Sequence, residues 1–304
     1  MAQIYYLPDE QAVDTEAGHS ILSIALRAGI PHTHACGGKA RCSTCRVAIL
    51  NGLSNVEPRT DDERVLADLL HLAPDIRLAC QTKIKGDVRL RRLVLDHEDE
   101  ILTDQERPDT VPVPVGMEKH VAIMFADIRN FTPFSERLLP YDIIHVLNRY
   151  FHLIGEAISG NGGFINNYMG DGIMALFGAD GEPEPEYHAV KAALAMLETV
   201  EQLKSYLDTT YHSTFDIGIG IHCGEVVVGS VGSLRRKMTT AIGAAVNVAS
   251  RVEAANKQAG TNLLISEPVY QMVVDQVEVG HTTRVTLKGK TGAQTLYEIV
   301  GLQR

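Results

Sequence analysis

The pattern of apolar and polar positions changes near residue 96. Before it, short apolar runs separated by turn residues are typical of a small unit rich in β structure. The pattern predicts strands at 3–7, 46–50 and 87–93 and a helix at 20–28. From residue 119 onward the apolar runs are longer and alternate between strand and helix periods, which predicts a second unit of a different kind.

In this second region strands and helices interleave. An apolar run at 121–125 predicts a strand, and residues 141–158 predict a helix whose apolar face carries Ile144, Leu147, Phe151, Ile154 and Ile158. A hairpin is expected at 164–177 around the turn Gly170-Asp171-Gly172, and a long helix at 186–207. A second hairpin is expected with strands at 215–221 and 226–229 around Cys223-Gly224.

Between the two regions the sequence loses periodicity and gains charge and proline, as linkers do. We therefore expect three parts: residues 1–95, a linker at 96–118, and residues 119–304. The interleaved elements favour an α+β fold class.

Composition and charge limit the number of domains, the partners and the location that are expected for the protein. At 304 residues, with 45% hydrophobic and 22% charged residues, the chain is expected to form two soluble globular domains. A formal net charge of -10 disfavours nucleic acid or an anionic membrane surface as the main partner. No apolar run approaches the roughly 18 to 20 residues that cross a bilayer, and the acidic N-terminus is unlike a signal peptide. A cytoplasmic location is the resulting expectation.

Four of the five cysteines fall within the first 80 residues, which points to a metal centre. Cys36, Cys42 and Cys45 lie on one short loop with glycine and small residues between them, and Cys80 is far downstream. Four thiolates can surround an iron-sulfur cluster. A structural zinc site is the alternative, although zinc ligands usually come as two closely spaced pairs and Cys80 has no nearby partner.

Residues 36–47 resemble the cluster loop of [2Fe-2S] ferredoxins, most closely the adrenodoxin-like branch, and the resemblance spans about residues 1–95. It implies a β-grasp fold and a [2Fe-2S] cluster held by Cys36, Cys42, Cys45 and Cys80. It also implies one-electron chemistry, with an electron-donor protein as a candidate partner.

Two aspartates of the second region are candidates for metal binding. Asp127 ends the predicted strand at 121–125, and Asp171 sits at the tip of the predicted hairpin. If that hairpin pairs beside the strand, both carboxylates converge at one sheet edge, where such oxygen ligands suit Mg²⁺ or Mn²⁺. Thr132 and Pro133 look like the N-cap and first residue of a helix, so Phe131 and Thr132 are expected near a polyphosphate.

Asn247 and Arg251 are spaced at i and i+4, so both project from one face of a predicted helix. The rest of that helix is largely apolar, and a paired amide and guanidinium within it need partners. An arginine placed there can stabilise charge on a transferring phosphoryl group. A solvated polar face is the alternative interpretation.

Across about residues 119–300 the chain resembles the catalytic domain of class III adenylate and guanylate cyclases. The matching segments are Phe125–Thr132, Gly170–Gly178, Ile217–Gly229, Ile242-Gly243 with Asn247 and Arg251, and Leu287–Lys290. The resemblance implies a βαββαβ sandwich that works as a homodimer and converts ATP into 3′,5′-cyclic AMP and pyrophosphate.

The resemblance also implies residue roles. Asp127 and Asp171, helped by the Ile128 carbonyl, would hold two metal ions, and Lys288 would bind phosphate. Asn247 would orient the ribose, and Arg251 would stabilise the transition state. Both would come from the second chain of the dimer and face the aspartates of the first.

The positions that select the base hold Asn167, where adenylate cyclases usually carry lysine, and Thr240. Their amide and hydroxyl can match an adenine edge, so ATP is expected over GTP. Three functions stay open from the sequence: a cyclase regulated by its cluster, a cyclase whose ferredoxin module is a docking platform, and a nucleotide-binding redox protein with a degenerate cyclase domain.

Overall fold

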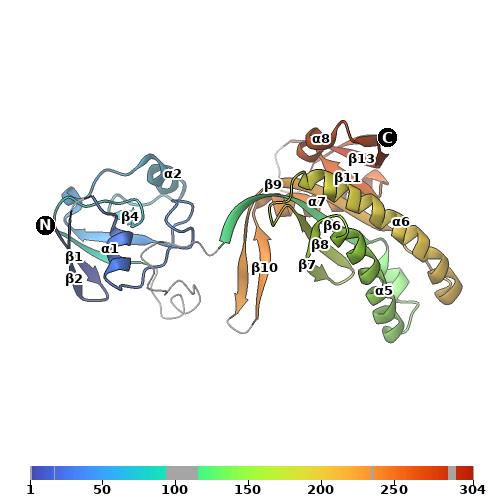
Figure 1. The fold of residues 1–304 in the computed structure, drawn as a ribbon, viewed down its shortest axis with the longest axis horizontal. Coiled ribbons are helices and arrows are strands. Elements are labelled where there is room, and N and C mark those ends of the chain that lie inside the picture. Colours follow the sequence, from blue (N-terminus) through green and yellow to red (C-terminus); the bar gives the residue numbers. More distant parts are fainter. Residues whose placement is uncertain (1, 17, 94–115, 234–235, 287–291, 304) are drawn as a thin grey trace. The chain divides into compact units, whose positions relative to one another are not determined.

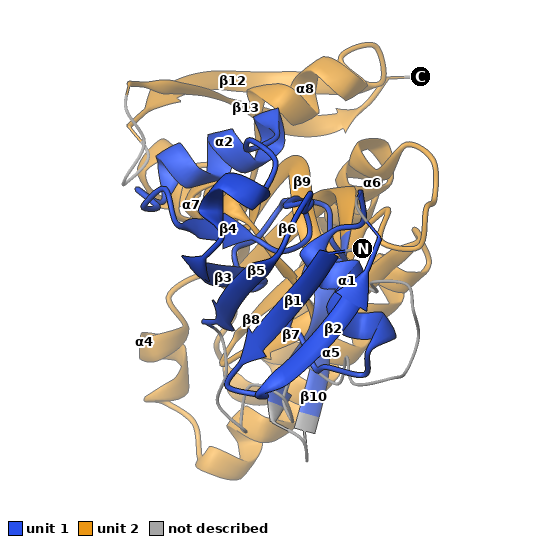
Figure 2. Ribbon diagram, turned by 90° about the vertical axis from the view of Figure 1, so that its left-hand side faces the viewer, with its two compact units in different colours: residues 1–117, 229–238 blue, residues 118–228, 239–304 orange. Residues whose placement is uncertain are grey.

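The computed structural model describes residues 2–16, 18–93, 116–233, 236–286 and 292–303 of this chain. The chain divides into two compact units, residues 1–117 with 229–238 and residues 118–228 with 239–304 (Figure 2). Two separate sheets and their helices confirm the predicted α+β class. The predicted boundaries at 95 and 118 stay predictions.

Residues 2–93 form a five-stranded sheet in the order β2-β1-β5-β3-β4. Its strands are β1 (Ala2–Leu7), β2 (Gln11–Thr15), β3 (Arg46–Asn51), β4 (Ile76–Leu78) and β5 (Val88–Arg92). β1 and β5 are parallel, and the other pairs are antiparallel. Helix α1 (Ile21–Arg27) joins the core, where the Tyr6 hydroxyl donates to the Ile21 carbonyl at 2.9 Å.

The predicted strands β1, β3 and β5 and helix α1 are confirmed in this region. The pattern missed β2, β4, a 3-10 helix (Leu53–Asn55) and helix α2 (Asp61–Leu69). Helix α2 exposes Val65 and Leu69, so its apolar positions do not form the single buried stripe that signals a surface helix.

Residues 116–303 form an eight-stranded sheet in the order β12-β13-β11-β9-β6-β8-β7, with β10 paired to β9 (Figure 1). The strands are β6 (Gly116–Ile128), β7 (Gly163–Met169), β8 (Gly172–Phe177), β9 (Ile217–Ser233), β10 (Arg236–Ile242), β11 (Leu263–Ser266), β12 (Val277–Val285) and β13 (Gln294–Leu302). The helices are α4 (Phe131–Ser135), α5 (Pro140–Ser159), α6 (Pro185–Tyr211), α7 (Ala244–Ala259) and α8 (Glu267–Val273).

Strand β6 is buried on both of its faces. Ala122, Met124 and Ala126 join the core beneath α5 and α6, which pack side by side (Figure 1). Val121 and Ile123 point the other way, into a second core with α7. Because helices cover both faces of the sheet, residues on both sides of this strand are apolar. The sequence therefore shows a continuous apolar run and not an alternation of apolar and polar residues.

The predicted long helices are confirmed as α5 and α6, but the predicted apolar face of α5 is partly wrong. Its buried residues are Val146, Tyr150, Ile154 and Ile158. Ile144 is 57% exposed, and the buried stripe begins at Val146, two residues later than predicted. No helix among the described residues is both long and apolar enough to span a bilayer.

The first predicted hairpin is confirmed as β7 and β8, and the second is wrong. β9 runs without a turn through Cys223 and Gly224, and it pairs with the next strand, β10, as well as with β11 and β6. The glycines of β9 serve helix packing instead: a Cβ on Gly220 would lie 2.0 Å from the backbone nitrogen of Glu253 in α7. Glycine within a strand marks such a close backbone approach as readily as it marks a turn.

Candidate iron-sulfur site and candidate active site

The four N-terminal cysteines come together as two pairs. The Sγ atoms of Cys45 and Cys80 lie 3.5 Å apart, and the Cys36 and Cys42 thiols hydrogen bond to one another. The loop that carries the first three turns at Gly37 and Gly38, whose φ angles are 65° and 80°. These left-handed values favour glycine, which explains the two residues after Cys36.

This set of donors fits a metal-sulfur group. The hydrogen bond from Cys42 lowers the pKa of Cys36 to about 5, and the hydrogen bond from Cys45 lowers the pKa of Cys80. Each pair therefore favours one thiolate, and thiolates are the form that ligates iron. Two pairs of cysteines suit two irons with two protein ligands each.

A buried ion pair holds the segment that carries Cys80. Glu63, in α2, is fully buried and accepts two hydrogen bonds from Arg77, at 2.9 and 2.8 Å. The same carboxylate accepts from the backbone N–H of Leu78 at 2.8 Å. Glu63 thus fixes the chain two residues before Cys80, a role that the sequence gave no sign of.

Asp127 and Asp171 converge as predicted. Asp127 lies at the end of β6, and Asp171 lies in the turn between β7 and β8. The register pairs Ala126 of β6 with Ile173 of β8, so the turn sits beside Asp127. A Cβ on Gly172 would lie 3.0 Å from Asp127 Oδ1, and the two carboxyl groups are within hydrogen-bonding reach.

The electrostatics of this pair favour a cation. Burial, and then the charge of Asp127, raises the pKa of the Asp171 carboxyl to about 6. Both effects disfavour the charged form of Asp171, the second because two adjacent carboxylates repel one another. Two oxygen donors in this arrangement fit Mg²⁺ or Mn²⁺, whose positive charge would offset that repulsion.

Two further side chains, which the sequence did not reveal, interact electrostatically with the acidic pair. Burial and the charge of Asp127 raise the pKa of Glu253, in α7, to about 7, against the lowering effect of Arg129. Tyr150, in α5, is fully buried, and its hydroxyl has no hydrogen-bond partner among the described residues. Burial, and next the charges of Asp127 and Asp171, raise its pKa. Tyr150 occupies a core position of its helix and Glu253 a position typical of a surface residue, so neither pattern marks a site.

Asn247 and Arg251 lie on α7 as predicted, but away from the acidic pair of their own chain. Asn247 is exposed and Arg251 is half-buried. Glu253, which faces Asp127, is two residues after Arg251, and two residues turn a helix by about 200°. Arg251 and Glu253 therefore lie on opposite flanks of α7, so Arg251 faces a different surface from the one beside Asp127.

The structure brings a further residue, Asn166, into contact with one of the predicted base-selecting residues, Thr240. Asn167 is exposed, whereas its neighbour Asn166 is 8% exposed and lies at an irregularity in the β7–β8 register. The Thr240 hydroxyl donates to Asn166 Oδ1 at 3.0 Å, and Asn166 Nδ2 donates to the Thr239 carbonyl at 2.6 Å. Asn166, not Asn167, therefore holds Thr240.

The predicted capping by Thr132 is wrong. Helix α4 begins at Phe131, and its N-cap is Asn130, whose φ of 55° is left-handed. Asparagine tolerates this conformation, and the helix begins two residues earlier than the Thr-Pro pair indicated. Thr132 is exposed, Phe131 is half-buried, and the Ile128 N–H donates to Asp127 Oδ1 at 3.2 Å. Lys288 lies outside the described residues, so its phosphate role stays a prediction.

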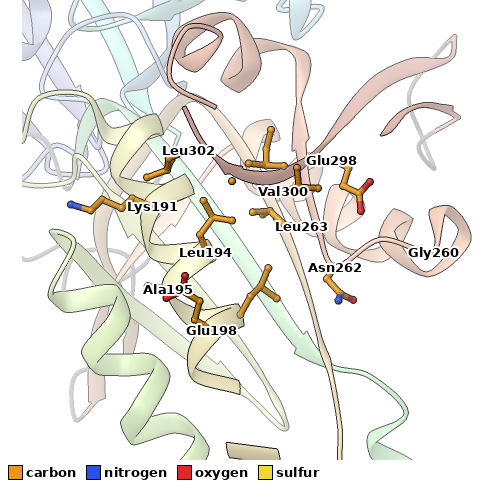
Figure 3. A pocket seen from close by; sticks show the side chains of 13 residues that line it. Lys191, Leu194, Ala195, Glu198, Gly260, Asn262, Leu263, Glu298, Val300 and Leu302 are labelled. Atoms are coloured by element: carbon orange, nitrogen blue, oxygen red, sulfur yellow. The ribbon is translucent and has the colours of Figure 1, made fainter. Parts of the chain in front are cut away.

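A pocket of about 640 Å³ lies elsewhere, between α6, the start of β11 and β13 (Figure 3). Leu194, Leu263 and Leu302 line its middle. None of its lining residues belongs to the acidic pair, to the base-selecting positions or to Asn247 and Arg251. Its lining is mixed, because Lys191, Glu198 and Glu298 line it together with the leucines.

Comparison with known families agrees with both sites. The model of the adenylate and guanylate cyclase catalytic domain matches residues 113–301. The model of the 2Fe-2S iron-sulfur cluster binding domain matches residues 4–85. The first match covers the acidic pair and α7, and the second covers all four paired cysteines.

Two curated relatives are named adenylate cyclases. An adenylate cyclase of Anabaena cylindrica is 38% identical over 63% of this chain and 39% of its own length. Adenylate cyclase 1 of Rhizobium meliloti (strain 1021) is 36% identical over 61% of this chain and 28% of its own length. The chain thus spans less than half of the length of each of these relatives.

Solved structures give the same fold. The guanylyl cyclase Cya2 matches with a TM-score of 0.59 and 31% identity, over 62% of this chain and 95% of that one. The adenylyl cyclase CyaB from P. aeruginosa matches with a TM-score of 0.57 and 27% identity, over 62% and 97%. Because both nucleotide specificities occur among the relatives, similarity alone does not choose the base.

Proposed function

We propose that this chain converts ATP into 3′,5′-cyclic AMP and pyrophosphate. The premise is that the chain belongs to the adenylate and guanylate cyclase family and carries an N-terminal ferredoxin-type domain. The observation that carries the proposal is the convergence of Asp127 and Asp171 at the end of β6. A cation-binding carboxylate pair is what phosphoryl transfer from a nucleotide requires.

The reaction joins the ribose O3′ to the α-phosphorus and breaks the bond from that phosphorus to the oxygen of the departing pyrophosphate. When bound by Asp127 and Asp171, Mg²⁺ or Mn²⁺ would lower the pKa of the 3′-hydroxyl and neutralise phosphate charge. Asn247 would orient the ribose through its amide. The Arg251 guanidinium would stabilise the charge that develops on the transferring phosphoryl oxygens.

A homodimer completes the site in this proposal. Arg251 lies on the opposite flank of α7 from Glu253, which faces the acidic pair of the same chain. One chain therefore offers the carboxylates on one surface and the Asn247–Arg251 pair on another. A twofold axis would bring these two surfaces together twice and give two equivalent sites.

The hydrogen bonds of Asn166 support ATP as the nucleotide. The Thr239 carbonyl can only accept, so it fixes Asn166 with Nδ2 toward Thr239 and Oδ1 toward Thr240. Thr240 then gives its only hydroxyl proton to Asn166 and presents lone pairs to a ligand. Those lone pairs can accept from the 6-amino group of adenine, whereas the 6-oxo group of guanine needs a donor.

We expect Asn166→Leu to lower the ratio of kcat/KM for ATP to that for GTP by about tenfold, the equivalent of one hydrogen bond of about 1.4 kcal/mol. The substitution frees the Thr240 proton to turn toward guanine. Asn167→Leu is the matched neighbour and should change the ratio less. The reverse order of effects would return base selection to Asn167, as the sequence predicted.

The ferredoxin-type domain gives the proposal its regulatory part. Cys36, Cys42, Cys45 and Cys80 would hold a [2Fe-2S] cluster that accepts one electron from a donor protein. We propose that the oxidation state of the cluster changes cyclase turnover, which requires the active and inactive arrangements to interact differently with the two redox states. The motivation is that both domains share one chain.

The test is product formation by anaerobically purified protein. Cyclic AMP and cyclic GMP are measured with Mn²⁺ or Mg²⁺, on cluster-oxidised and dithionite-reduced samples, with a chelator control that should abolish product. We expect cyclic AMP from ATP, at a rate that differs between the redox states. Equal rates would leave a cyclase whose ferredoxin domain is a docking platform. Absence of both products would make the chain a nucleotide-binding redox protein.

A further inference from the structure

A second group of metal-ligating side chains lies far from Asp127. His120 is near the start of β6, Glu186 is in the first turn of α6, and Cys223 is in the middle of β9. One ligand atom from each of the three lies within 4.8 Å of the others. At about 3.3 Å per residue along β6, His120 is more than about 20 Å from Asp127, so this group is separate from the candidate active site.

The two inner members of the group are buried. Glu186 is 2% exposed and Cys223 is 6% exposed, whereas the His120 side chain is 47% exposed. The His120 Nε2 atom lies 2.8 Å from Glu186 Oε1, and the Cys223 thiol hydrogen bonds to the same carboxyl. A buried carboxylate needs such compensation, and here protons shared by an imidazole and a thiol supply it.

We propose that His120, Glu186 and Cys223 form a zinc site. A divalent cation would take the place of the proton on Cys223 and the hydrogen bond to His120. One carboxylate, one thiolate, one neutral imidazole and Zn²⁺ sum to zero charge, which suits a buried position. Three protein ligands leave a fourth, tetrahedral position for water.

The donor types separate this site from the candidate active site. A thiolate and an imidazole select zinc over magnesium or calcium, whereas the all-oxygen pair at Asp127 and Asp171 has the opposite preference. The chain would thus hold the two kinds of cation at two places without exchange between them.

A further carboxylate stands behind the histidine. Glu225 Oε1 lies 3.6 Å from His120 Nδ1, just beyond hydrogen-bonding distance, and its side chain is 73% exposed. A small rotation of this exposed side chain would bring it within reach, and a carboxylate hydrogen bonded to a metal-binding histidine orients the ring and raises its basicity. With zinc bound, this shell would tie the start of β6, the start of α6 and the middle of β9 to one another.

Zinc binding to the full chain, with its iron-sulfur cluster assembled, tests the proposal. The protein is titrated with Zn²⁺ against a chromophoric chelator, and zinc and iron are counted per chain. We expect one zinc per chain at unchanged iron content. His120→Gln and Cys223→Ala should each weaken binding at least tenfold, and Glu225→Gln should weaken it by about tenfold. His152→Gln, at an exposed histidine of α5, is the matched control and should bind as the wild type does.

X-ray absorption at the zinc edge identifies the ligands independently of affinity. One sulfur with nitrogen and oxygen neighbours is expected. Four sulfur neighbours would mean that zinc had entered the site of Cys36, Cys42, Cys45 and Cys80, and would overturn the proposal. Unchanged binding in both His120→Gln and Cys223→Ala, with wild-type thermal unfolding of the zinc-free variants, would leave the group as a hydrogen-bonded network only.

Discussion

Asp127→Asn is expected to lower cyclic nucleotide formation by a factor on the order of 10³, because charge stabilisation at the reacting phosphate is the main contribution in phosphoryl transfer. The substitution keeps the size and hydrogen-bonding shape of the side chain and removes its charge. The fold should survive, since Asp127 is exposed at the end of β6. The measurement is product formed per minute at saturating ATP and Mn²⁺, with thermal unfolding as the check on folding.

Mixing this variant with Arg251→Ala should restore activity if each site is built from two chains. In an equal mixture half of the dimers are mixed, and one of the two sites in each mixed dimer is intact, which gives about one quarter of the wild-type rate. Asp127→Asn mixed with Asp171→Asn is the control, because both changes fall on the same side of the site. No recovery in the first mixture would place Asp127 and Arg251 in the same chain's site. Recovery in the control would mean that Asp127 and Asp171 of one site come from different chains.

The sequence predicts those residues of the candidate active site that local patterns mark, which are the two aspartates. Asp127 follows an apolar run of strand length, and Asp171 lies in a turn marked by two glycines, so pairing β6 with β8 brings them together. Tyr150 and Glu253 escaped prediction because their helical positions are those of core and surface residues. Their relation to the acidic pair arises only when α5 and α7 pack on the sheet.

The errors in the fold have a common physical cause. Gly224 and the glycines before it resemble a turn signal, yet they lie in β9 because α7 packs against that strand at the backbone of Glu253. The same ambiguity hid Asn166: alternation along β7 should have turned one neighbour inward and the other outward, but a register irregularity decides which. A sequence pattern gives the period of an element, while long-range contacts decide which face is buried.

Glu63→Ala is expected to cost about 3 to 5 kcal/mol of stability in the ferredoxin-type domain, the usual effect of leaving one partner of a buried ion pair alone. Arg77 is 3% exposed and would keep its charge without the carboxylate that compensates it. The Leu78 N–H would also lose its acceptor, two residues before Cys80. Because that segment carries one of the four paired thiols, iron content should fall along with stability.

The measurement is urea unfolding of the full chain, with the visible absorption of the cluster as the probe, because this absorption reports on the stability of the ferredoxin-type domain. Asp61→Ala in the same helix is the matched control: its ion pair with Arg64 is exposed, with side chains 92% and 60% accessible, so its loss should cost less than about 1 kcal/mol. A wild-type midpoint and iron content in Glu63→Ala would show that Cys80 is held by the cluster itself. The buried pair would then be a consequence of the fold rather than its support.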